Sequence, residues 1–311
     1  MTALEHVLLI FAGVQTAFVV LDVLTLSRDA RGGALPALRH VGRRTAAFLA
    51  AVWLVYFVIQ ASLMALVPGV DDVVGWLATI VAPPAPLPGA PSWTLVPLLA
   101  ATWVVAGFWD YALHRWLLHT RCGWFLHENH HLPTVVANGV PGISVRPFVA
   151  VTTFLTYLGT AAVMLAVMTL TATTALVPRY LACVPVLVLA LTLVGSASHS
   201  AFLRKFPWVH GLLRPLLLTT PQEHLLHHGA RLAGNYGNFT SLWDRVFGTY
   251  LSPAEGESRA LELGLTYDQD FLGTLTAGRF KLSPPVREHY RLDAFCHLSR
   301  RHGAANEEVV R

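Results

Sequence analysis

The chain has 311 residues, of which 54% are hydrophobic and only 13% are charged. A soluble domain carries roughly 25% charged residues, so this composition indicates a membrane protein. The net charge of +4 is modest and no basic stripe is interleaved with aromatic residues, which argues against nucleic acid as a partner. The three cysteines are widely scattered and indicate neither a disulfide framework nor a zinc ribbon.

Apolar stretches near the ~20 residues needed to cross a bilayer predict about five membrane-spanning helices. They cover residues 7–26, 46–67, 93–118, 148–170 and 181–198. The loop after the first stretch is rich in arginine, whereas residues 68–92 contain no Lys or Arg. The positive-inside rule therefore places the first loop, and everything after Ser198, in the cytoplasm. We expect an all-α, polytopic helical bundle with a cytosolic helical cap.

Two short motifs of the form H-x-x-H-H lie about a hundred residues apart. On a helix, positions i, i+3 and i+4 share one face, so each motif can direct three imidazoles at one point. Three imidazoles on one face have no structural use and repel one another when protonated, whereas imidazole is a good ligand for iron, zinc, copper and nickel. The motifs supply six candidate metal ligands: His127, His130, His131, His224, His227 and His228.

Three further histidines are candidate ligands because of where they lie. His114 and His119 end the predicted helix 93–118 and are roughly 140° apart on an ideal helix, so they contact two different metals or lie where the helix unwinds. His199 ends a predicted span at the same membrane face. The resulting nine imidazoles are too many for one zinc and suit two metals. We expect the isolated histidines to be structural: His6, His40, His210, His289, His297 and His302.

Four carboxylates lie close to these histidines in the sequence. A metal-bound histidine usually donates its second N–H to a carboxylate or a carbonyl group. The candidates for this role are Asp110, Glu128, Glu223 and Asp244.

The order of these motifs resembles the fatty acid hydroxylase/sterol desaturase superfamily of membrane di-iron enzymes. That pattern has a spaced histidine pair, an H-x-x-H-H motif, a further histidine and a second H-x-x-H-H motif. Residues 235–237 are similar to the family's N-Y-G motif, and residues 243–249 to its W-D-R-x-F-G-T motif. Thr220 and Pro221 fit the branch containing alkylglycerol monooxygenase in particular. The resemblance covers about residues 103–250.

The resemblance implies a helical membrane enzyme whose cytosolic cap contains two iron ions ligated by the nine histidines. Such enzymes use O₂ as co-substrate and two external electrons to hydroxylate or desaturate a C–H bond of a lipid or sterol. The electrons would come from a ferredoxin or cytochrome b5 type donor, because no flavin or haem is expected in this chain. Some members have an extra histidine where this chain has Leu203, which leaves a tenth ligand to water, Asn235 or Asn238.

The implied domains are N-terminal membrane spans over 1–92, a catalytic domain over 93–250 and a cytosolic tail over 251–311. The tail shows no site signal, and no catalytic residue is expected beyond the metal ligands. We expect an integral membrane protein, in the inner membrane of a bacterium, with the metal site on the cytoplasmic side.

Two other functions are compatible with parts of the sequence. Residues 127–131 also read H-E-x-x-H, the motif of a zinc metalloprotease with Glu128 as the base, although this needs one more ligand and leaves most grouped histidines unused. The second of these functions is that of a membrane protein that binds metal without catalysing a reaction. The substrate also stays open among sterols, fatty acyl chains, ether lipids, ornithine lipids and carotenoids, with hydroxylation favoured modestly over desaturation.

Overall fold

The computed structural model is described mainly over five segments, and its regular structure there is helical. Within these segments the β-structure is limited to isolated bridges such as the one between Leu218 and Thr240, which agrees with the all-α expectation. The predicted spans 7–26, 46–67 and 148–170 lie outside the described residues except for isolated positions. The described residues are 95–132, 177–229, 232–253, 263–265 and 267–290, with Gly159 and isolated positions between 10 and 58.

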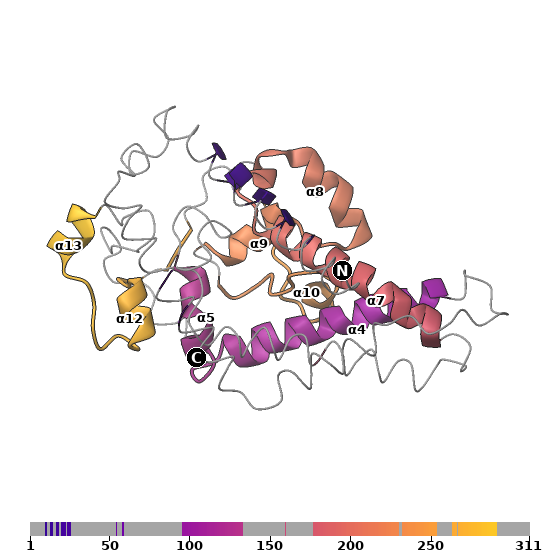
Figure 1. Ribbon diagram of the computed structural model, residues 1–311, viewed down its shortest axis with the longest axis horizontal. Coiled ribbons are helices and arrows are strands. Elements are labelled where there is room, and N and C mark those ends of the chain that lie inside the picture. The colour runs from indigo at the N-terminus through magenta and orange to yellow at the C-terminus, as the bar shows by residue number, and fades with distance from the viewer. Residues whose placement is uncertain are drawn as a thin grey trace.

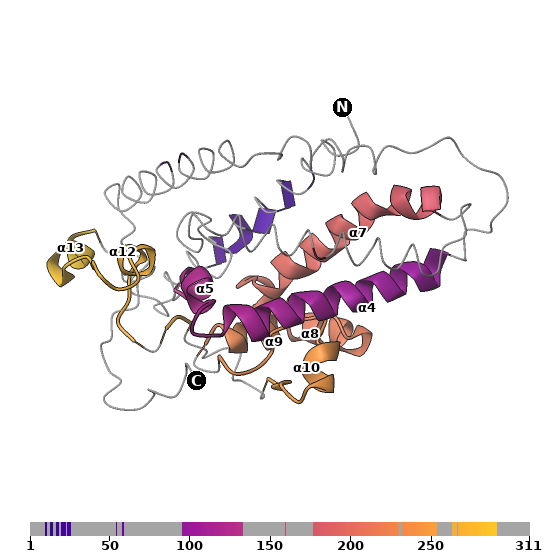
Figure 2. The ribbon, with the colours of Figure 1, turned by 90° about the horizontal axis from the view of Figure 1, so that it is seen from below.

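Two long helices lie side by side and form the frame of the molecule (Figures 1 and 2). Helix α4 covers Leu95–Leu113 and continues as a π-helix over His114–Leu118, in agreement with the helix predicted over 93–118. Helix α7 covers Val177–Ser198 and begins four residues before the predicted start. Pro178 is compatible with this earlier start, because the first turn of a helix needs no N–H from proline.

Residues Leu95–Leu118 are long and apolar enough to cross a membrane, and in the described part of the chain they are the one helix that passes this test. The number of spans and the side of the membrane stay predictions.

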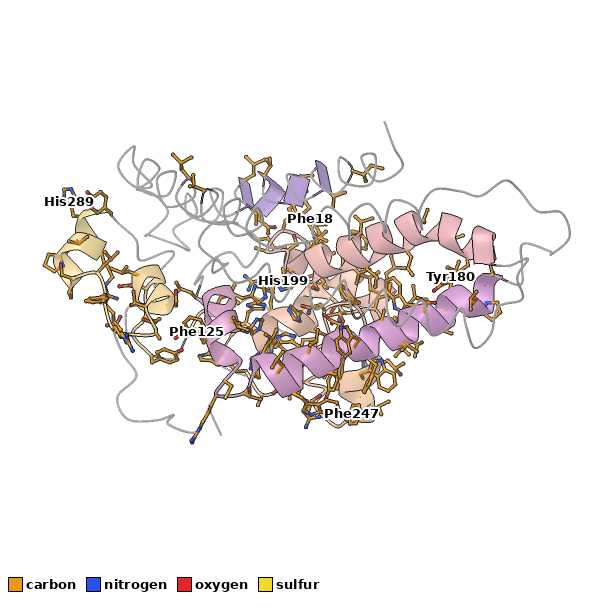
Figure 3. The ribbon with its side chains drawn as sticks, turned by 60° about the horizontal axis from the view of Figure 1, so that its bottom comes forward. Phe18, Phe125, Tyr180, His199, Phe247 and His289 are labelled. Carbon is orange, nitrogen blue, oxygen red and sulfur yellow. The ribbon has the colours of Figure 1, made fainter. Side chains whose placement is uncertain are left out.

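The contact between α4 and α7 is apolar with one polar pair near the start of α7 (Figure 3). Its buried side chains are Leu95, Leu98, Tyr180, Leu187 and Leu191. Thr102 Oγ1 donates to the carbonyl of Leu98 at 2.8 Å and accepts from the hydroxyl of Tyr180 at 2.6 Å. The two hydroxyl groups are therefore hydrogen-bonded within an otherwise apolar contact.

Shorter helices cover one end of this frame (Figure 2). Helix α5 (Trp124–His131) follows the π-helix, and α9 (Pro221–His227) packs on α7. Thr220 and Glu223 form a capping box at the start of α9, with Pro221 in its first turn, so the sequence fixes where this helix begins. The remaining helices are η4 (Leu203–Lys205), α8 (Pro207–Leu213), η5 (Arg214–Leu216), α10 (Leu242–Val246), α12 (Phe271–Leu275) and α13 (Pro284–His289).

Asp22 connects the first predicted span to the turn that follows α7. Its carboxylate is buried and accepts hydrogen bonds from Ser200 Oγ at 2.8 Å and from the backbone N–H of Phe202 at 2.9 Å. The turn immediately after His199 is thereby held in place by a residue far away in the sequence.

The hydroxyl pair between α4 and α7 gives a test of this packing. Thr102→Val leaves the Tyr180 hydroxyl buried without its acceptor, which is expected to cost about 1–3 kcal/mol of stability. Adding Tyr180→Phe removes the unpaired group, so the double variant is expected to recover part of the lost stability. Unfolding in detergent of the parent, both single variants and the double variant measures the coupling, and purely additive effects would contradict the contact.

Candidate metal centre

All nine grouped histidines come together at the end of α4 and α7, around His199 at the centre of Figure 3. They form two clusters, and in each cluster the candidate ligand atoms lie within 4.8 Å of one another. The five-histidine cluster contains His114, His119, His127, His131 and His227. The four-histidine cluster contains His130, His199, His224 and His228.

Each H-x-x-H-H motif is divided between the two clusters, whereas the sequence predicted that each would direct three imidazoles at one point. At about 100° per residue, positions i and i+4 lie about 40° apart and position i+3 lies on the other side of i. In the first motif the i, i+4 pair belongs to the five-histidine cluster and His130 to the other. In the second motif the pair belongs to the four-histidine cluster and His227 crosses to the five-histidine cluster.

The π-helix explains how His114 and His119 come to share a cluster. Its wider winding closes a hydrogen bond from the N–H of His119 to the carbonyl of His114 at 3.1 Å, five residues back. The two ring centroids are consequently 5.0 Å apart. The helix therefore widens at this point, which is close to one of the two alternatives predicted for this pair, and both histidines lie in the five-histidine cluster.

Backbone carbonyl groups fix the protonated nitrogen in four of the imidazoles. Nδ1–H of His114 donates to the carbonyl of Tyr236, and that of His227 to the carbonyl of Gly234 at 2.8 Å. The corresponding bonds of His224 and His199 go to the carbonyls of Asn235 at 3.2 Å and of Gly195 at 2.7 Å. Because a carbonyl only accepts, Nδ1 carries the proton in each neutral ring and Nε2 is left as a bare lone pair.

These bare nitrogens face one another. Nε2 of His227 lies 3.1 Å from Nε2 of His114, and Nε2 of His224 lies 3.0 Å from Nε2 of His199. In neither pair can one nitrogen donate to the other. The buried Nε2 atoms of His119 and His228 have no hydrogen-bond partner. Converging lone pairs of this kind fit a cation in each cluster.

Burial keeps the imidazoles neutral, which is the form that binds a metal. Burial lowers the pKa of His127, His131 and His224 well below the ordinary value, and nearby imidazoles lower it further. The same two causes act on His119, His130, His227 and His228. Burial also lowers the pKa of His199 to about 4, although its bond to Gly195 opposes the shift.

Three of the predicted carboxylates position the loop and the helix that surround the histidines. Asp244 accepts from the N–H groups of Tyr236 and Gly237, each at 2.9 Å, and Asp110 accepts from the N–H of Asn238 at 2.8 Å. Glu223 completes the capping box of α9 and accepts from the Tyr250 hydroxyl at 2.6 Å. Burial raises the pKa of Asp244 to about 6, so this carboxylate is still mainly ionised at neutral pH.

The two asparagines considered for a tenth ligand also position the loop. The Asn235 amide donates to the carbonyls of Glu223 at 2.8 Å and Leu251 at 2.9 Å, and its oxygen accepts from the N–H of Leu251 at 2.7 Å. Its φ of 56° lies in the left-handed region, where asparagine is enriched. The Asn238 amide donates to Asp110 at 2.9 Å.

Sequence reasoning missed two groups of residues near the site. It did not identify the carbonyls of Gly195, Gly234 and Tyr236, although the N-Y-G motif was a signal for the loop that carries most of them. It also missed Tyr267 and Gln269, which donate to Glu128 Oε1 at 2.5 and 2.9 Å. No pattern in the tail pointed to these two residues.

The helical fold and the two histidine clusters define the class of protein: a helical protein with a candidate histidine-ligated metal centre. Residues 99–249 match the model of the family described as fatty acid hydroxylase. The family consists of membrane-associated, typically iron-dependent oxidoreductases. No curated protein and no solved structure matches the chain.

Asp244 gives a test of the loop that orients the imidazoles. Asp244→Ala leaves the N–H groups of Tyr236 and Gly237 without their acceptor and frees the carbonyls that fix His114, His224 and His227. We expect metal affinity to fall roughly 10- to 100-fold, the usual effect of losing such outer contacts. Competition with a chelator measures it. Glu288→Ala, on the exposed surface of α13, is the control, and equal affinities in the two variants would contradict this role.

Proposed function

We propose that this protein is a membrane di-iron oxygenase that hydroxylates a C–H bond of a lipid or sterol with O₂. One observation carries the proposal: two adjacent clusters of neutral imidazoles, five and four in number, direct unprotonated nitrogens inward at the end of an apolar helix. The fatty acid hydroxylase family match supports the same reaction class.

The nine histidines would bind two iron ions, which supply O₂ activation when present. Histidine-only ligation without cysteine suits iron, zinc, copper or nickel, and iron is the choice that allows redox chemistry with O₂ in this family. The protein residues keep the imidazoles neutral, orient them through backbone carbonyls and surround them with buried side chains. Insertion of one oxygen atom consumes O₂, two electrons and two protons and releases one water.

The position of the clusters favours an apolar substrate. They lie where α4 and α7 end, and both helices carry exposed apolar side chains, Val105 and Leu193 among them. A lipid chain or sterol in a membrane would approach along these helices. Hydroxylation and desaturation begin with the same hydrogen abstraction, and we favour hydroxylation because the family is described by that reaction.

Electrons would have to come from a separate carrier such as a ferredoxin or cytochrome b5. Basic residues close to the site suit an acidic carrier, and Arg121 and Lys205 are exposed. Two other candidates are engaged internally: Arg115 donates to the Tyr111 hydroxyl at 2.6 Å, and Arg245 lies 3.7 Å above the Tyr250 ring. Arg204 is partly buried, and Arg231 lies outside the described residues.

The zinc protease has less support. Its motif needs Glu128 as a base beside the metal, but Glu128 Oε1 accepts from both Tyr267 and Gln269. Its two ligands, His127 and His131, share their cluster with three more histidines, which is more than a four-coordinate zinc with an open position uses.

Glu128→Gln separates these two functions. A protease loses its base and is expected to lose nearly all activity, whereas a hydroxylase keeps an oxygen that accepts from Tyr267 and Gln269 and retains most activity. The measurement is lipid product formed by purified enzyme with a reductase, a carrier and oxygen-18 gas, read by mass spectrometry.

The proposed reaction requires the label from the gas to enter the lipid. Product that carries oxygen from water, or turnover that continues without O₂, would contradict an oxygenase. Peptide cleavage that is lost in Glu128→Gln would favour the protease instead.

A further inference from the structure

A short segment of the tail contacts both histidine motifs. It comprises residues 263–265 and 267–270 and is called the strap here. It follows the residues that match the family and belongs to the tail for which the sequence gave no site signal. Figure 2 shows that α12, directly after the strap, lies beside α5.

The first contact of the strap is with Glu128, in the middle of the first motif. The Tyr267 hydroxyl donates to Glu128 Oε1 at 2.5 Å, and Gln269 Nε2 donates to the same oxygen at 2.9 Å. Glu128 and Gln269 are both buried, so these bonds form away from bulk water. Glu128 is flanked in the sequence by His127 and lies near His130 and His131, so its position sets the rotation of α5.

Tyr267 also orients a wall of the five-histidine cluster. Its oxygen accepts from Trp124 Nε1 at 3.0 Å. The Trp124 ring stacks on His131, with centroids 5.3 Å apart and planes at 30°, and lies 5.2 Å from His119. The Tyr267 hydroxyl therefore bonds both to Trp124, whose ring contacts His119 and His131, and to the Glu128 carboxylate.

The second contact of the strap is with the end of the second motif. The N–H of Gly264 donates to the carbonyl of His228 at 3.0 Å, and Leu263 packs with Leu225 in a buried cluster. Gly264 has a φ of 107°, a conformation that favours glycine. The strap thus contacts α5 and the end of α9 with residues only a few positions apart.

The strap is itself fixed by the helices that follow it. Asp270 caps α12 through the N–H of Gly273 at 2.7 Å and accepts from the N–H of Leu282 at 2.8 Å. Arg287 of α13 is buried and donates to both oxygens of Asp268, at 2.6 and 3.2 Å. Helices α12 and α13 therefore hold the strap in the position from which it contacts α5 and α9.

We propose that the strap is a working part of the metal centre, in which Tyr267 and Gln269 are positioning residues for the five-histidine cluster and Gly264 fixes the end of the second motif. This inference rests on the metal centre of the proposed function and not on the reaction itself. The residues act through Glu128, Trp124 and His228, not by touching substrate.

The test uses the full chain in detergent, loaded with cobalt(II) alone. Tyr267→Phe removes only the bridging hydroxyl from a partly exposed ring, and Glu128→Ala removes the shared acceptor. Both are expected to release cobalt to a chelator roughly tenfold faster than the parent and to alter the visible cobalt absorption bands. Glu128→Gln keeps the acceptor oxygen and is expected to restore both properties.

Tyr290→Phe is the matched control, since it makes the same change elsewhere in the tail. Release rates and spectra of Tyr267→Phe and Glu128→Ala that equal those of this control would overturn the proposal, as would a lower melting temperature with an unchanged spectrum. A parent that binds cobalt but oxidises no lipid with iron contradicts the proposed function alone. A parent that binds no cobalt contradicts the metal centre on which both proposals depend.

Discussion

The metal centre depends on backbone carbonyls that decide which nitrogen of an imidazole carries its proton. The carbonyls of Gly195, Gly234, Asn235 and Tyr236 each accept from an Nδ1–H, which leaves the Nε2 atoms bare. Two bare nitrogens about 3 Å apart repel each other unless a cation lies between or beside them. The carbonyls that orient the imidazoles therefore also create the need for a cation between the Nε2 atoms.

Most other polar residues near the site support those carbonyls. Asp244 fixes the N–H groups of Tyr236 and Gly237, Asp110 fixes Asn238, and Asp22 fixes the turn after His199. Asp244 acts within its own loop, whereas the bonds of Asp110 and Asp22 join segments more than a hundred residues apart in the sequence. The site is thus assembled by long-range hydrogen bonds around two apolar helices, and a change that touches no imidazole can still displace several of them.

Features of the fold and of the metal centre could be predicted where short stretches of the sequence encode them. The two H-x-x-H-H motifs and the apolar stretches carry local signals, so the grouping of nine histidines and the helices α4 and α7 could be predicted. A departure from regular helix at His114 and His119 was one of two alternatives, and the sequence could not choose between them because only tertiary packing selects the wider turn. The carboxylates were expected to accept from imidazole N–H groups, but the bonds of Asp110, Glu223 and Asp244 position the surrounding loop and helix instead. Partners such as Tyr236 and Tyr267 depend on loops that no periodicity describes.

The most direct test of a two-metal centre is the metal content of the full chain purified in detergent, measured by elemental analysis with variants of each cluster. The account predicts about two irons per chain in the parent. His130→Ala, in the smaller cluster, is expected to lose about one of them, and His119→Ala, in the larger cluster, to retain both because four imidazoles remain. A single zinc that persists in His130→Ala would contradict the two-metal centre.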